Sequence, residues 1–351
     1  MFPPNGGAQI LFDRALGLHR QGQIGEAEHL YRQVLKLDPG HAGTLHLLGV
    51  AARQKGNSAV AVEMIRQAIA QEDGIPAFHS NLGNALSDLG RTDEAIEAFR
   101  AAIRLQPDFA EAHFNLGNAL AAAGQTEAAI AAFSDALLHR ADFAEAHTNL
   151  GVALNRAGRL EDAVAAHCFA IRQNPNLADA RFNLGVVLHD LGYLDQAAKS
   201  FGDAIRLRPN HADSFINLGN TLCEGGHYEQ ARQAFEVAIR LTDASAEAHN
   251  GMAVAQLHLG KVIDSISAAE RAVELRPDYA EAHNTLGNGR RDLGQFERAV
   301  AAYNDAIRFK PDYAAAYSSL LLCQHYRSDL SPEAILAETR RFAARFELMA
   351  A

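Results

Sequence analysis

The chain has 351 residues, a formal net charge of −10, no tryptophan and only ten prolines. The negative charge argues against unspecific binding to nucleic acid or to an anionic membrane surface. The three cysteines, Cys168, Cys223 and Cys323, follow no metal-binding spacing, so we expect no disulfide framework and no metal or other cofactor. The first residues lack a signal-peptide pattern, and no run of about 18 apolar residues occurs. We therefore expect a cytoplasmic protein without a membrane partner.

Small residues recur along the chain with a period of 34. Glycines separated by this interval are Gly49, Gly83, Gly117, Gly151, Gly185 and Gly219, and after one interruption Gly287. Alanines follow most of these glycines at two fixed distances, as Ala129 and Ala136 follow Gly117. A strict period of this size indicates a solenoid, in which neighbouring repeats bury one another's apolar faces.

Each repeat is predicted to form two antiparallel helices. In residues 110–143 the first helix should cover about 110–123 and end at Gly124, a residue that tolerates the backbone of a helix end. Thr126 is predicted to cap the second helix. Gly117 and Ala129 should let the two helices approach closely, while larger apolar side chains fill the remaining space.

The pattern of Leu-Gly, Ala, aromatic, Ala and Pro resembles the tetratricopeptide repeat. With Gly117 as position 8, nine units cover residues 8–313, after a disordered N-terminus at 1–7. An irregular unit and an amphipathic capping helix should follow at 314–351. The resemblance implies an all-α, right-handed superhelical solenoid of about ten helix–turn–helix units, with the first helices lining its concave side.

A polar stripe follows the first helices. Positions 2, 6, 9 and 13 fall within an arc of roughly 60°, away from the core positions. Positions 2 and 13 are mostly acidic, as Glu111 and Asp88 illustrate, with Arg156 as an exception. Positions 6 and 9 carry the predicted peptide-binding asparagines: Asn81, Asn115, Asn149, Asn183 and Asn217 at position 6, and Asn84, Asn118 and Asn220 at position 9.

A carboxamide both donates and accepts hydrogen bonds, as an extended peptide backbone requires. The stripe therefore predicts a protein or peptide partner bound as an extended, basic or neutral segment in the groove. The alternative is that these asparagines are only tolerated polar residues on a solvated face. No nucleic-acid partner is expected.

Other chemistry-bearing residues do not form a recognisable active site. The histidines at position 4, such as His113, should be buried and hydrogen-bonded, and successive ones lie too far apart to share a metal ion. The cysteines should be small core residues without an activating base. No nucleophile and base stand out, so we expect a non-catalytic scaffold.

The tail YRSDLSPEAILAETRRFAARF resembles the junction between repeats and transferase domain in bacterial relatives of the O-linked N-acetylglucosamine transferases. This resemblance implies a second role, in which the repeats recruit substrates for a glycosyltransferase, whether the chain is free-standing, truncated or cut from a larger enzyme. A third role is self-assembly into a homo-oligomer. The sequence leaves these alternatives open.

Overall fold

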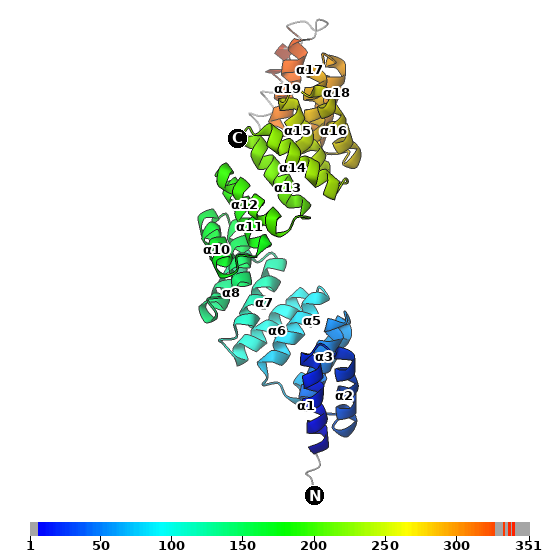
Figure 1. Ribbon diagram of the computed structural model, residues 1–351, viewed down its shortest axis with the longest axis vertical. Coiled ribbons are helices and arrows are strands. Elements are labelled where there is room, and N and C mark those ends of the chain that lie inside the picture. Colours follow the sequence, from blue (N-terminus) through cyan, green and yellow to red (C-terminus); the bar gives the residue numbers. More distant parts are fainter. Residues whose placement is uncertain (1–5, 327–332, 334–335, 338, 341–351) are drawn as a thin grey trace. The chain divides into compact units, whose positions relative to one another are not determined.

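The computed structural model describes residues 6–326, 333, 336–337 and 339–340. Every regular element among these residues is an α-helix. The helices form two compact units, Met1–Pro175 and Asn176–Ala351. In each unit antiparallel helix pairs stack on one another, which confirms the predicted all-α solenoid (Figure 1). The predicted capping helix falls largely outside the described residues.

The described residues of the first unit form ten helices. They are α1 (Gly6–Arg20), α2 (Ile24–Leu37), α3 (Ala42–Gln54), α4 (Ser58–Gln71), α5 (Pro76–Asp88), α6 (Thr92–Leu105), α7 (Ala110–Ala122), α8 (Thr126–His139), α9 (Ala144–Arg156) and α10 (Leu160–Gln173). The second unit contains α11 (Ala178–Asp190), α12 (Leu194–Leu207), α13 (Ala212–Glu224), α14 (Tyr228–Leu241), α15 (Ala246–His258), α16 (Val262–Leu275), α17 (Ala280–Asp292), α18 (Phe296–Phe309) and α19 (Ala314–His325). We call the odd-numbered helices the first helices of their pairs and the even-numbered ones the second helices.

A tight turn joins the two helices of each pair. Gly124 has a φ of 73°, a backbone conformation that strains any residue with a Cβ atom, and an equivalent glycine recurs in every pair from Gly22 to Gly294. The prediction that Thr126 caps α8 is wrong. Gln125 occupies the cap position without a side-chain hydrogen bond, and Thr126 is the first helical residue. The turn is so short that the threonine already lies inside the helix.

Within a pair, a ring on the second helix packs against bare backbone on the first. A Cβ atom added to Gly117 would lie 2.6 Å from the ring of Phe133, and one added to Gly185 would lie 2.7 Å from the ring of Phe201. Both rings are almost completely buried. The side chains that occupy this ring position are Tyr31, Ile65, Phe99, Phe133, His167, Phe201, Phe235, Ala269 and Tyr303. The recurring glycine therefore provides space for the side chain of its own repeat.

The repeat at residues 246–279 changes both members of this contact together. Ala253 replaces the glycine, and Ala269 replaces the ring. Both alanines are fully buried, and they pack with Leu286 and Ala302 of the following pair. Adding a methyl group on one helix is compatible with close packing here because the opposing side chain has become small.

We predict that Gly185→Ala lowers the free energy of unfolding by about 1–3 kcal/mol, because the new methyl group must displace the buried ring of Phe201. Gly202→Ala is the matched control. Gly202 lies on the facing helix α12, where a Cβ atom would have no neighbour within 4 Å. It should stabilise the protein by about 0.5–1 kcal/mol, the usual gain over glycine inside a helix. Urea denaturation of both variants tests the contact, and equal midpoints would contradict it.

Candidate functional site

The eight predicted asparagines all lie on first helices. In the first unit Asn81 and Asn84 lie on α5, Asn115 and Asn118 on α7, and Asn149 on α9. In the second unit Asn183 lies on α11, and Asn217 and Asn220 lie on α13. Asn220 is exposed, and the other seven are half-buried. We call the side of the first helices that carries these residues the first-helix face, and we treat it separately in each unit.

Some of these amides are already used within the protein. Asn149 donates to Asn118 Oδ1 of the preceding repeat at 2.8 Å, and Asn81 donates to His46 Nε2 of the preceding repeat at 2.8 Å. Asn217 donates to the backbone carbonyl of Asp213. In contrast, Asn84, Asn115, Asn183 and Asn220 have no hydrogen-bond partner in the described part of the chain. Part of the predicted ladder therefore connects repeats, and part of it is available to a ligand.

The acids at position 2 are less available than the sequence suggested. Most of them pair with a base at position 31 of their own repeat, as in Arg140–Glu111 at 2.6 Å and Arg208–Asp179 at 2.8 Å. Glu247 pairs in the same way with Arg276, and Glu281 pairs with Lys310. These ion pairs are solvent-exposed and contribute little to stability. They do reduce the negative charge of the first-helix face, and with it the reason to expect a basic ligand.

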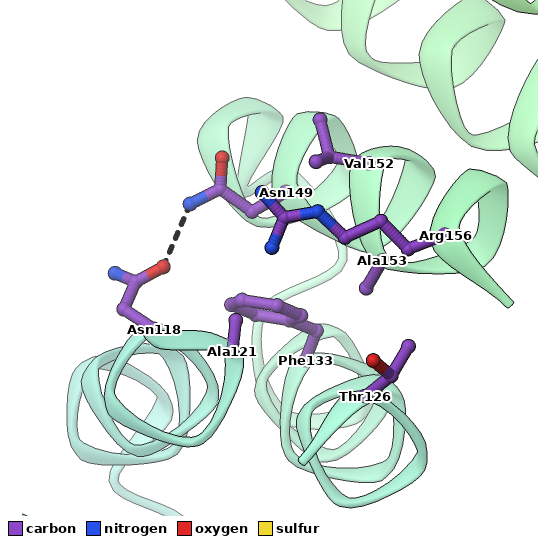
Figure 2. Close-up of a pocket in the computed structure, with 8 residues that line it drawn as sticks. All are labelled: Asn118, Ala121, Thr126, Phe133, Asn149, Val152, Ala153 and Arg156. Atoms are coloured by element: carbon purple, nitrogen blue, oxygen red, sulfur yellow. Dashed lines mark hydrogen bonds between the residues drawn. The ribbon is translucent and has the colours of Figure 1, made fainter. Parts of the chain in front are cut away.

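A pocket of about 210 Å³ lies between α7, α8 and α9 on the first-helix face of the first unit. Asn118 and Asn149 form one edge, the Phe133 ring lies at the base, and the Arg156 side chain reaches back across the opening (Figure 2). Thr126 lines the side nearest the start of α8. We call this the Arg156 pocket.

The same arrangement recurs one repeat earlier. A second pocket, of about 200 Å³, is lined by residues that lie 34 positions before those of the Arg156 pocket: Asn84, Ser87, Thr92, Phe99, Asn115 and Ala119 in place of Asn118, Ala121, Thr126, Phe133, Asn149 and Ala153. We call it the Asn84 pocket. Asn118 lines both pockets.

Sequence reasoning placed the asparagines on the first-helix face but missed the ring and the threonine that complete each pocket. From the sequence, larger apolar residues such as Phe133 are expected only to fill the core, and Thr126 is expected only to cap a helix. The signal was present, because Thr92 and Phe99 repeat at the same interval of 34 residues. In the second unit, Asn217 and Asn220 line a more polar pocket of about 430 Å³ together with Asp213, Glu247 and Tyr279.

The position-4 histidines have a structural role. His113 Nε2 lies 2.8 Å from the carbonyl of Pro107, six residues earlier, and His283 makes the equivalent contact with Pro277. His79, His147 and His249 make the same contact in their repeats. Each ring ties a first helix to the turn before it. Among the described residues, no cluster of histidine, cysteine, aspartate and glutamate is suited to hold a metal ion.

Two other histidines are buried where protonation is costly. Burial lowers the pKa of His46 to about 4, with a smaller contribution from His19, and His46 Nε2 accepts the hydrogen bond from Asn81. Burial also lowers the pKa of His167 to about 4. His167 takes the place that phenylalanine has in neighbouring repeats, and neither of its ring nitrogens has a hydrogen-bond partner.

The cysteines are only partly as predicted. Cys323 is buried, but Cys168 is exposed on α10, so its assignment to the core is wrong. Cys168 directly follows the core residue His167, and this one-residue step along the helix turns its side chain outward. Burial raises the pKa of Cys223 to about 11, with help from Glu224, and keeps this thiol protonated at neutral pH.

None of the described helices is both long enough and apolar enough to cross a membrane.

Comparisons with known sequences agree with this architecture. Models of the tetratricopeptide repeat match residues 8–41, 83–124, 117–168, 178–211, 216–280 and 287–320, which together make up more than half of the chain. No curated protein matches the sequence. These results lend no support to the resemblance between the tail and glycosyltransferases.

Several solved structures are similar to this chain. A chain of the APC/C hetero-tetramer Cut9–Hcn1 is 13% identical, with a TM-score of 0.56 over 90% of this chain and 76% of that one. PilF of Pseudomonas aeruginosa is 21% identical, with a TM-score of 0.53 over 60% of this chain and 96% of its own. YrrB, described as a tetratricopeptide repeat protein with an unusual peptide-binding site, is 26% identical, with a TM-score of 0.48 over 57% of this chain and 99% of its own. The first two share the fold.

We predict that His167→Phe reduces the loss of stability in mild acid. The pKa of His167 is about 4 in the folded protein and 6.5 ordinarily, so the neutral ring stabilises the fold fully above about pH 6.5. This stabilisation is lost progressively as the pH falls from 6.5 toward 4. At about pH 5 the loss amounts to about 2 kcal/mol. Urea denaturation at neutral pH and at pH 5 measures the difference, with exposed His29→Gln as the control. An unchanged pH dependence in His167→Phe would contradict the assignment.

Proposed function

The chain belongs to the tetratricopeptide repeat family, and on that basis we propose that it is a non-catalytic scaffold that binds an extended polypeptide on its first-helix face. Repeats of this kind generally provide extended surfaces for protein–protein interaction. The observation that carries the proposal is the recurrence of one pocket with equivalent walls in successive repeats. A surface that presents equivalent small pockets in two successive repeats suits a linear ligand that extends across both repeats.

The chemistry of the pockets also suits a peptide. Asn84 and Asn115 line the Asn84 pocket with amides that have no partner in the described chain, and an amide can pair with both the N–H and the C=O of a backbone. The Phe99 ring beneath them is almost fully buried and closes the pocket from below. The amides therefore supply the polar contacts for the backbone of a bound residue.

The dimensions agree with an extended ligand. Packed helices lie about 10 Å apart, and an extended chain advances about 3.3 Å per residue. Consecutive pockets on the first-helix face are at least one such distance apart, which corresponds to about three or more ligand residues. A ligand in a helix, which rises 1.5 Å per residue, would need about seven residues to cover the same distance.

Self-assembly is the competing role, because α1, α8 and α16 expose Ile10, Leu138 and Ile263. These residues are on helices far apart in the sequence, and single exposed apolar side chains are normal on a soluble surface. Recruitment of substrates for a glycosyltransferase rests largely on the tail resemblance, and most of the tail falls on residues outside the described part. We therefore favour peptide binding over both alternatives.

We predict that the triple variant Asn84→Ala, Asn115→Ala, Asn183→Ala binds peptides at least tenfold more weakly, because three unengaged amides are lost from the first-helix face. The measurement is affinity selection from a randomised dodecapeptide library, followed by titration of the selected peptides. Far-ultraviolet circular dichroism and the melting temperature should stay nearly unchanged.

The matched control is Gln196→Ala, Gln230→Ala, Asn304→Ala, which removes three exposed amides from second helices. It should bind as the unaltered chain does. Equal losses in both triple variants, or no loss in either, would reject the first-helix face as the binding surface. A particle mass that rises with concentration in light scattering would instead favour self-assembly.

A further inference from the structure

Arg156 interrupts a position that is otherwise often acidic. Residues at the same place in other repeats include Asp88, Asp190, Glu224 and Asp292. Each of these acids has a basic neighbour: Asp88 pairs with Arg53, Asp292 with Arg291, and Asp190 and Glu224 lie close to His189. Arg156 is exposed and has no ion-pair partner in the described part of the chain. Its guanidinium is therefore available to a ligand.

The pocket beside Arg156 presents several groups suited to an anion. Arg156 is the one charged residue that lines it. Two side chains add donors: the Thr126 hydroxyl and the Asn118 amide, whose oxygen accepts from Asn149 but whose N–H groups are not used by the described residues. Helix α8 begins at Thr126 without a side-chain cap, so the positive end of its dipole lies at the same wall. Glu127 follows on the first turn, but it is exposed and does not line the pocket.

The Asn84 pocket differs in charge although its walls are otherwise equivalent. Ala122 stands where the Arg156 pocket has Arg156. The two charged residues that line the Asn84 pocket, Arg53 and Asp88, neutralise each other at 2.7 Å. The first unit thus presents a neutral pocket and, one repeat later, a cationic one.

We propose that the Arg156 pocket binds the carboxylate of an aspartate or glutamate side chain in the extended ligand, while the Asn84 pocket takes an uncharged side chain at another position of the same ligand. A guanidinium can hold a carboxylate through two parallel hydrogen bonds, and the partly exposed side chains of Ala121 and Val152 can contact the methylene groups beside it. This inference rests on the proposed function, and it replaces the sequence-based expectation of a basic or neutral ligand in this part of the chain.

The test compares peptides selected from the randomised library by the unaltered chain and by Arg156→Glu. The unaltered chain should select aspartate or glutamate at one fixed position. Arg156→Glu should lose that preference or reverse it toward lysine and arginine. Lys199→Glu is the control, since it makes the same change of charge at an exposed site in the middle of α12. It should select the same peptides as the unaltered chain.

A pair of synthetic peptides then measures the contact itself. Replacing the selected acid by its amide should weaken binding to the unaltered chain about tenfold and binding to Arg156→Ala less than twofold. If peptides bind without an acidic preference, or if the preference survives in Arg156→Glu, the carboxylate site is rejected while the peptide-binding scaffold stands. If no peptide binds to the unaltered chain, the proposed function fails and the carboxylate site fails with it.

Discussion

The close contact between a ring on the second helix and bare backbone on the first sets the geometry of most repeats. Because Gly117 has no side chain, α7 and α8 approach closely enough for the Phe133 ring to be almost fully buried between them. The same ring also lines the pocket between α7, α8 and α9 (Figure 2). The same side chain thus belongs to the hydrophobic core and lines the candidate site. The pocket is found in successive repeats because the packing of this side chain is repeated.

The polar groups of the first-helix face serve two purposes. The Asn149–Asn118 bond holds adjacent repeats together, and most acids at position 2 are paired with bases of their own repeat. What is left for a ligand is therefore a subset of the amides and the unpaired Arg156. A protein with a net charge of −10 can in this way present a locally positive pocket. The local electrostatic potential depends more on which charges are paired within each repeat than on the net charge of the chain.

The sequence predicts the helices and their packing well, because both depend on contacts within one repeat. The period of 34 residues locates the glycines, the turn at Gly124 and the buried rings. None of these features depends on how neighbouring repeats are placed in space. The site is less predictable. Whether Asn149 is free depends on its partner in the preceding repeat, and whether Glu111 is free depends on the placement of Arg140 across the pair. The errors at Thr126 and Cys168 have a different cause, which is a difference of one residue in helical register. For Thr126 it decides between the cap position and the first turn, and for Cys168 it decides between the core and the surface.

The position of Asn118 in the wall of two successive pockets has a consequence for any ligand that occupies both. A ligand side chain that reorients the Asn118 amide in one pocket also changes the shape and the hydrogen-bonding groups of the other pocket. The free energies contributed by two neighbouring ligand residues are then not additive. Specificity in the first unit would be expressed as preferred combinations of residues at a fixed separation, so a matrix of independent single-residue preferences would describe it poorly.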